Sequence, residues 1–167
     1  MTCIKRLIAV GAVLAFGLLG ASSAFAAKPT HETSTSPPVE FPAGFVCEFP
    51  IQVSAQTSNV TTFFDRQGNP VRILITHFSP VTVTNADTGK SITVPHGAAF
   101  HSFPNPDGSQ TLITTGHALV AAFPTDVGGP SLTLYSGRVV QTLTANFDLT
   151  AITTSGKSVD MCAALSG

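Results

Sequence analysis

Apolar and polar residues alternate with a period of two along much of the chain after Phe45. The alternation is clearest over 47–53, 71–75, 81–83 and 92–94. A period of two is typical of β-strands that bury one face and leave the other in solvent. The chain after Phe45 is therefore expected to fold mainly as strands.

Turn sequences separate these segments at intervals typical of an all-β protein. The clearest turn is Pro104-Asn-Pro-Asp-Gly108, where proline presets φ and glycine permits a positive φ. No amphipathic helix is evident after residue 26, although 159–165 could form one helical turn. The pattern predicts a single antiparallel β-barrel of about eight to ten strands, with a β-sandwich as the alternative.

The apolar phase changes within the segment 131–145. Leu132 and Leu134 share one parity, whereas Val139 and Leu143 have the other. A change of phase inside a strand pattern predicts a β-bulge near Gly137. The side chains expected to point inward are Phe49, Ile51, Val53, Val71, Ile73, Ile75, Val81, Val83, Ile92, Val94, Leu112, Leu119, Leu132, Leu134 and Leu143.

The first 26 residues have the order of a secretory signal peptide. Lys5 and Arg6 precede an apolar run over 7–19, and Ala24-Phe-Ala26 provides a small-x-small cleavage site. The alternative is a membrane anchor, but the run is shorter than the roughly 20 residues that a membrane span needs. We therefore expect a secreted, extracellular protein with no stable membrane insertion after cleavage.

Cleavage after residue 26 would leave two cysteines, Cys47 and Cys162. Outside the cytoplasm such a pair indicates a disulfide, and the competing interpretation is a catalytic thiol. Residues 27–44 are rich in Pro, Thr and Ser and are expected to form a flexible leader. The β domain is then expected to span 45–167.

Charge and motif content argue against several classes of function. The formal charge is −1, and losing Lys5 and Arg6 would make it −3, so no nucleic-acid partner is expected. The chain has no Gly-x-Ser-x-Gly nucleophile motif, no cofactor motif, and aspartates mainly in turn sequences. We therefore expect a non-enzymatic exported barrel without a cofactor, which binds a small apolar ligand or a surface partner.

The alternative function is histidine-dependent metal binding. The spacing of Pro95-His96-Gly97, His101 and Asn105 nearly resembles the second motif of the cupin family, although the first cupin motif is absent. His96 and His101 are therefore the candidate metal ligands, with His77 or His117 as additional ones. Phe100 and Phe103 flank His101, and we expect them to lie in a loop that contacts a ligand or partner.

Three stretches of the sequence resemble stretches in other proteins. They are Val81-Thr-Val-Thr-Asn-Ala-Asp-Thr-Gly-Lys90, Leu134-Tyr-Ser-Gly-Arg-Val-Val140 and Val159-Asp-Met-Cys-Ala-Ala-Leu165. They are similar to a loose group of uncharacterised secreted actinobacterial proteins, over most of 45–165. The resemblance implies secretion and a common all-β fold, and it implies no activity.

Overall fold

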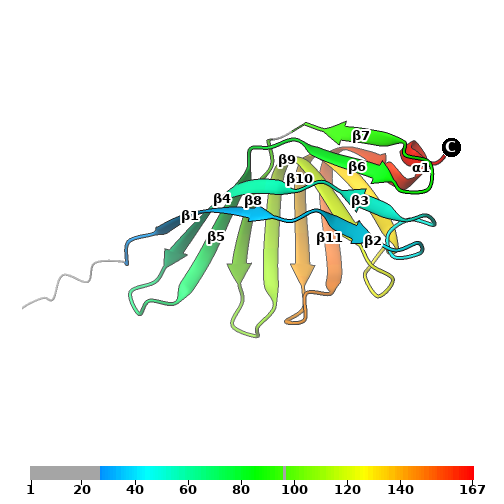
Figure 1. Ribbon diagram of the computed structural model, residues 1–167. Coiled ribbons are helices and arrows are strands. Elements are labelled where there is room, and N and C mark those ends of the chain that lie inside the picture. Colours follow the sequence, from blue (N-terminus) through cyan, green and yellow to red (C-terminus); the bar gives the residue numbers. More distant parts are fainter. Residues whose placement is uncertain (1–26, 96) are drawn as a thin grey trace, which may run out of the picture.

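The computed structural model describes residues 27–95 and 97–167, so the expected signal peptide over 1–26 lies outside the described residues. The described part contains eleven strands and one short helix (Figure 1). All pairings between neighbouring strands are antiparallel. The predicted all-β class is therefore confirmed.

Seven strands form the larger sheet, in the order β1-β4-β5-β8-β9-β10-β11. They are β1 (Thr30–Ser36), β4 (Gln56–Phe64), β5 (Pro70–His77), β8 (Ala99–Pro104), β9 (Gln110–Ala122), β10 (Ser131–Leu143) and β11 (Leu149–Asp160). The strands β8 to β11 follow one another along the chain and pair in that order, so hairpins build this half of the sheet.

Four short strands form the smaller sheet, in the order β2-β3-β6-β7. They are β2 (Val39–Phe41), β3 (Ile51–Val53), β6 (Val81–Asn85) and β7 (Ser91–Val94), and the helix α1 (Met161–Leu165) lies beside them. Figure 1 shows this sheet lying over one end of the larger one. The two sheets are not closed into a barrel.

The main core lies between the smaller sheet, α1 and the adjoining ends of β9 and β10. Ile51, Val83 and Leu165 are completely buried there, and Leu132 and Met161 are 1% exposed. Leu119 and Ala121 of β9, Phe123 directly after β9, and Leu134 of β10 complete this core. The period-two alternation of β3 and β6 thus has the expected cause, because one face of each strand is buried.

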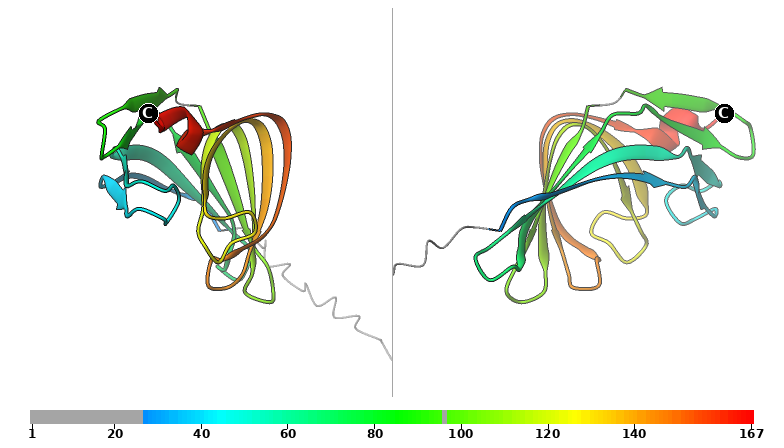
Figure 2. Two further views of the ribbon diagram at one scale, coloured as in Figure 1. Left: turned by 90° about the vertical axis from the view of Figure 1, so that its right-hand side faces the viewer. Right: turned by 60° about the vertical axis from the view of Figure 1, so that its left-hand side comes forward.

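A row of glycines crosses β9, β10 and β11 where these strands bend. Gly137 pairs with Gly116 on one side and with Gly156 on the other. All three have positive φ, and a Cβ added to Gly137 would collide with the carbonyl oxygen of Ser155. Figure 2 shows that β9, β10 and β11, coloured from yellow-green to red, arch over strongly. Glycine permits the bend because side chains are excluded from it.

The bend explains the phase change in β10, and the predicted bulge at Gly137 is wrong. The register runs through Gly137 without a shift, and the irregularity occurs between Thr142 and Leu143. On one side of the bend Leu134 packs under the smaller sheet. Beyond the bend Val139 is buried on the opposite face, in a cluster with Ala118 and Tyr135 from the Leu134 side of the bend. The apolar phase therefore changes because the face of Leu132 and Leu134 is covered before the bend, whereas the face of Val139 is covered beyond it.

The expectation of a flexible leader over 27–44 is also corrected. Residues 30–36 form β1, which pairs with β4 along its whole length, and residues 39–41 form β2. The threonines of β1 are β-branched and form side-chain hydrogen bonds across the pair, such as Thr33 Oγ1 to Asn59 Oδ1 at 3.1 Å. An exposed polar strand can therefore form here without burying apolar side chains.

Candidate functional site

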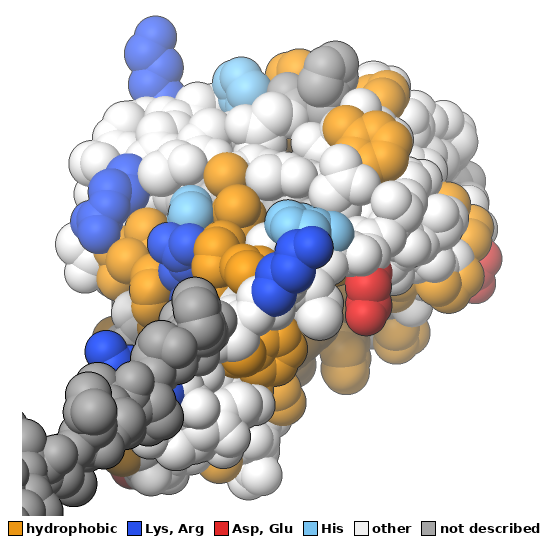
Figure 3. All heavy atoms as spheres, turned by 90° about the vertical axis from the view of Figure 1, so that its left-hand side faces the viewer, with side chains coloured by type: hydrophobic (Ala, Val, Ile, Leu, Met, Phe, Trp, Pro, Cys, Tyr) orange, Lys and Arg blue, Asp and Glu red, His pale blue; other side chains and the backbone are white. Residues whose placement is uncertain are grey.

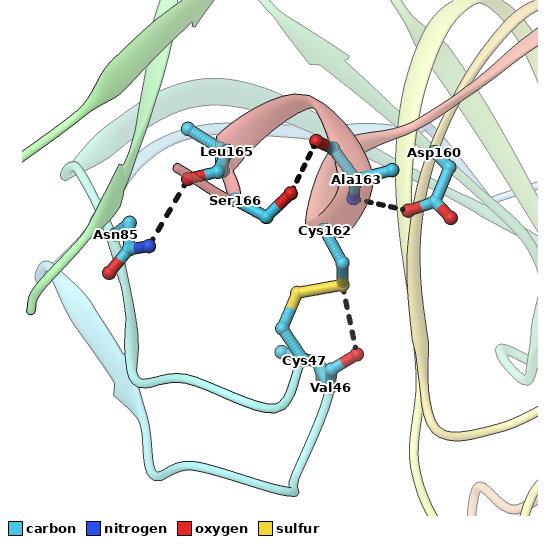
Figure 4. The surroundings of a disulfide bond; sticks show 8 residues. All are labelled: Val46, Cys47, Asn85, Asp160, Cys162, Ala163, Leu165 and Ser166. Atoms are coloured by element: carbon cyan, nitrogen blue, oxygen red, sulfur yellow. Dashed lines mark hydrogen bonds between the residues drawn. A yellow bond between two sulfur atoms is a disulfide. The ribbon is translucent and has the colours of Figure 1, made fainter. Parts of the chain in front are cut away.

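The predicted disulfide joins Cys47 to Cys162, with their Cα atoms 5.4 Å apart. It fixes α1 to the turn before β3 (Figure 4). The Asp160 carboxylate accepts a hydrogen bond from the Ala163 amide at 3.1 Å and caps the helix. Both cysteines of the described chain are therefore structural, which removes the catalytic-thiol alternative.

A buried asparagine fixes the other end of α1. Asn85 is 2% exposed, and its Nδ2 donates to the Leu165 carbonyl at 3.1 Å. Its Oδ1 accepts from the Asp87 amide at 2.9 Å. The side chain thus connects the β6–β7 turn to the C-terminal helix. The 81–90 stretch singled out in the sequence has a structural role at this position.

A pocket of about 400 Å³ lies beside the disulfide and opens to solvent. Its lining includes Glu48, Phe49, Asp160 and Cys162. The Asp160 carboxylate is already engaged in capping α1. This pocket therefore combines a structural bridge with a structural carboxylate, and it is open to solvent instead of enclosed.

A smaller pocket, of about 80 Å³, lies beside the end of β5 and the start of β8. His77 and Phe100 line it together with Val81 and Val94 of the smaller sheet. His77 contacts the Phe100 ring edge-on, with the ring centroids 4.9 Å apart. The Nδ1 atom of His77 is buried without a hydrogen-bond partner among the described residues, and burial lowers the pKa of this imidazole. The space accommodates a few water molecules, since ligand sites usually exceed about 300 Å³.

The structure places the histidine candidates in different surroundings. His96 lies outside the described residues. His101 lies on β8 and stacks on Phe103, with ring centroids 6.5 Å apart. His117 also lines the small pocket, and its Nδ1 lies 3.0 Å from Ser136 Oγ. Residues 27–95 and 97–167 contain no cluster of three or more His, Cys, Asp or Glu that could hold a metal.

Phe100 and Phe103 do not form the expected loop, because both belong to β8. Phe100 lies opposite Ile75 and Thr114, whereas Phe103 lies opposite Thr111. Residues three apart in a strand point to opposite faces, so the two rings cannot act together as a lid. The sequence Ala-Phe-His-Ser-Phe misled the prediction because large side chains occupy both faces of this strand.

One face of the larger sheet carries a patch of half-buried apolar and basic side chains, which we call the basic face. Its members lie in three adjacent rows of opposed strand positions. The central row is Thr61, Leu74, His101, Ile113, Val140 and Thr153. The row on one side contains Phe63, Arg72, Phe103, Thr111 and Thr142. The row on the other side is Asn59, Thr76, Ala99, Thr115, Arg138 and Ser155.

None of the residues on the basic face is buried. On the opposite face of the same strands Val60, Ile73 and Phe100 are also only half-buried, and full burial is found mainly on β9 and β10. Thr114 and Val139 on that opposite face are completely buried, and Gln141 is 7% exposed. Figure 3 views the molecule from the left-hand side of Figure 1 and shows hydrophobic, basic and histidine side chains interleaved, with an acidic side chain beside them. The basic face is thus an uncovered sheet surface with large apolar side chains, which is uncommon for a sheet in water.

Arg72 is the most constrained cation of the basic face. Its Cζ atom lies 3.8 Å from the centroid of the Phe63 ring, in a cation–π contact. Arg138 is exposed at the middle of β10 and extends into solvent. Lys157 follows on β11, opposite Ser136 and next to the third row. No local sequence motif marks this surface, since its members come from strands far apart in the chain.

The acidic residues that accept the shortest hydrogen bonds lie in turns and stabilise them. Asp65 and Asp107 occupy the β4–β5 and β8–β9 turns. Hydrogen bonds from Asn69 lower the pKa of Asp65, and those from Ser109 lower the pKa of Asp107. Asp126 accepts from the amides of Phe123 and Leu149, both at 2.7 Å. These carboxylates stabilise loops, as their positions in turn sequences indicate.

No protein-family model matches the chain, and comparisons with curated proteins and with solved structures find no similar protein. Within the described residues, no helix has the length and apolar character needed to cross a membrane. The functional interpretation therefore depends on the surfaces described above.

Proposed function

We propose that the chain is an exported, non-enzymatic binding protein, built as an open β-sandwich, whose basic face contacts a surface partner. The observation that carries this proposal is the uncovered apolar patch on the larger sheet. Ile113 and Val140 lie side by side in its central row, Leu74 follows on the other side of His101, and all three apolar side chains are only partly buried. Contiguous apolar surface that the fold leaves uncovered is typical of interaction sites.

The composition of the basic face supports a protein-binding role. Phe63, Phe103 and Arg72 belong to the residue types that are enriched in interface centres. The pockets give less support to a small apolar ligand. The pocket beside Phe100 is about 80 Å³, and the pocket of about 400 Å³ is open and includes carboxylates. A surface partner is therefore favoured over an enclosed ligand.

Export is supported by the signal-like order of residues 1–26 and fits the Cys47–Cys162 disulfide. Mass spectrometry of the protein collected from the medium of its native host tests this part. The expected N-terminus is Ala27. Retention of the whole chain in the cell, with 1–26 still attached, would contradict export.

Site-specific photo-crosslinking tests the binding surface. Thr61 and Thr62 are neighbours on β4, both are half-buried, and they point to opposite faces. A photoreactive residue at Thr61, expressed in the native host, is expected to form a covalent adduct with a second molecule. The same residue at Thr62 is the matched control and is expected to form none. Adducts only at Thr62, or at neither position, would refute the proposal.

Metal binding through His96 and His101 is the alternative that the near-cupin spacing suggests. Elemental analysis of the purified mature protein separates it from the proposal. Stoichiometric Zn, Mn, Cu or Fe that is lost in a His96→Ala, His101→Ala variant would favour this alternative. A metal-free protein whose Thr61 crosslink persists would favour the binding role.

A further inference from the structure

We propose that the partner of the basic face is a protein surface with an apolar centre and acidic surroundings. This inference rests on the proposed function and adds the chemistry of the partner. It follows from the charges on the face, from the geometry of Arg72, and from the way the apolar side chains are presented.

The charges within the three rows of the basic face have one sign, although Glu32 on the adjoining strand β1 lines a pocket together with Asn59, Thr61 and Thr76. Arg72 and Arg138 lie in its two outer rows, Lys157 lies next to it, and His101 lies at its centre. No position in the three rows is Asp or Glu, although the chain as a whole has more acidic than basic residues. The segregation is therefore local, and a partner with acidic groups would complement it.

Arg72 is already oriented for a carboxylate. The Phe63 ring supports one side of its guanidinium, with 3.8 Å between Cζ and the ring centroid. A stacked guanidinium keeps its N–H groups free at the edge, where they can bind a carboxylate through two hydrogen bonds. Stacking also restricts the rotamers of the long side chain before binding, so less entropy is lost when a partner docks.

The presentation of the apolar side chains favours a protein partner over a lipid surface. Leu74, Ile113 and Phe103 lie along the strands and are half-buried among threonines. A bilayer is best entered by side chains that protrude, whereas another protein can fit a low-relief surface. Phe147 is 65% exposed, more than any other large apolar residue in the described part of the chain, but it lies in the β10–β11 turn next to Asp148 and not in the three rows.

A second copy of the chain does not fit as a face-to-face partner. Two basic faces in contact would bring the arginines of one copy against those of the other, and no carboxylate on the face could pair with them. The partner is therefore a different protein surface, and its acidic groups should surround apolar side chains.

Selection from a displayed library of random 12-residue peptides tests this inference, with the mature, disulfide-bonded protein as bait. We expect the enriched peptides to combine Asp or Glu with Leu, Ile or aromatic residues. Their affinity should fall as salt is raised, because ion pairs contribute to binding. Enrichment of neutral or basic peptides, or no enrichment, would overturn the inference.

Charge variants locate the binding. An Arg72→Gln, Arg138→Gln variant is expected to bind the selected peptide at least tenfold more weakly, since each arginine loses a charge-assisted contact. Arg72→Lys keeps the charge but loses the planar guanidinium and should still weaken binding several-fold. Arg66→Gln is the matched control, because Arg66 is exposed in the β4–β5 turn and lies off the face. Equal binding by the double variant and wild type would contradict the inference.

Lipid binding is tested in parallel with vesicles of phosphatidylcholine containing 30% phosphatidylglycerol. Co-sedimentation with these vesicles, lost in the Arg72→Gln, Arg138→Gln variant, would replace the protein partner with a lipid surface. The Thr61 crosslink separates this failure from failure of the proposed function. An adduct at Thr61 with a partner that is not acidic would refute the inference and leave the binding role standing.

Discussion

Thr114 is a buried residue whose hydroxyl makes no hydrogen bond with the described residues. It is completely buried, between Phe100 on β8 and Val139 on β10, and its Oγ1 has no hydrogen-bond partner among the described residues. A buried hydroxyl without a partner carries a desolvation cost. Thr114→Val keeps the shape of the side chain and is expected to raise the free energy of unfolding by about 1 kcal/mol.

Urea denaturation measures this change. Thr115→Val is the control, because Thr115 is exposed on the opposite face of β9. The control should shift stability by less than about 0.5 kcal/mol. A loss of stability in Thr114→Val would show that the hydroxyl is satisfied, for example by a bound water.

The lowered pKa of His77 allows a prediction of how the free energy of unfolding depends on pH. Burial lowers its pKa in the folded state below the ordinary value of 6.5. The unfolded chain therefore takes up this proton at a higher pH than the folded one, so the contribution to stability is fully present above pH 6.5. It is lost as the pH falls from there towards the folded pKa.

Thermal unfolding between pH 8 and 5 tests this dependence. His77→Phe removes the titrating group and should reduce the fall in Tm on the acidic side. Thr76→Val, one residue earlier on β5, is the control, because it removes no titrating group and should leave the slope unchanged. An equal slope in wild type and His77→Phe would contradict the assignment.

The sequence identified core residues well where one face of a strand is covered. Ile51, Val53, Val83 and Leu132 were expected to point inward, and all are buried. Val71 was expected inward too, yet it is 45% exposed. It lies near the register irregularity at Phe63/Phe64, at the end of the sheet that the smaller sheet does not cover. Alternation of apolar and polar residues indicates a strand, but it does not show which part of the strand another layer of the fold will bury.

At the scale of elements, the glycine row is the feature with the largest expected effect of a single substitution. Gly137 has φ +148°, and an added Cβ would collide with the Ser155 carbonyl oxygen on the adjacent strand. Gly137→Ala is therefore expected to lower the free energy of unfolding by about 3 kcal/mol, because the β10–β11 pairing must shift.

Denaturant titration of Gly137→Ala measures this loss. Ser136→Ala, one residue earlier on the same strand, is the control and should change stability by less than about 1 kcal/mol. If Gly137→Ala were as stable as Ser136→Ala, the bend would not depend on glycine at this position.

The elements also show where prediction from sequence reaches its limit. The tail over 159–165 was expected to form one helical turn, and α1 occupies Met161–Leu165. β1 was missed because every residue in it is exposed, so no apolar alternation marks it.

The basic face could not be predicted either. Its rows join residues from β4 to β11, and only the register brings Leu74, His101 and Ile113 together.

At the scale of the whole molecule, the disulfide spans most of the fold. Cys47 and Cys162 are 115 residues apart, so the closed loop includes every strand from β3 to β11. This bridge was predicted from the expected export of the protein and from the two cysteines that remain after residue 26. It could not predict how the sheets are arranged, because that depends on where β9, β10 and β11 bend and on which face the smaller sheet covers.

Removing the bridge should have a large effect on stability. A Cys47→Ala, Cys162→Ala variant is expected to lose about 4–5 kcal/mol, the chain-entropy cost for a loop of this length. That is a large share of the roughly 5–15 kcal/mol that stabilises a typical domain. The effect should be greatest at α1, because Met161 and Leu165 pack into the main core next to the bridge.

Equilibrium unfolding of the oxidised wild type, the reduced wild type and the double-alanine variant measures this contribution. The reduced wild type should match the variant, because both lack the crosslink. Hydrogen exchange then locates the loss: amides of α1 and the smaller sheet should lose protection before those of the β9–β10 pair, which is thirteen residues long on each strand. An unchanged unfolding midpoint would mean that packing of α1 against Asn85 and the core holds the two sheets together without the bridge.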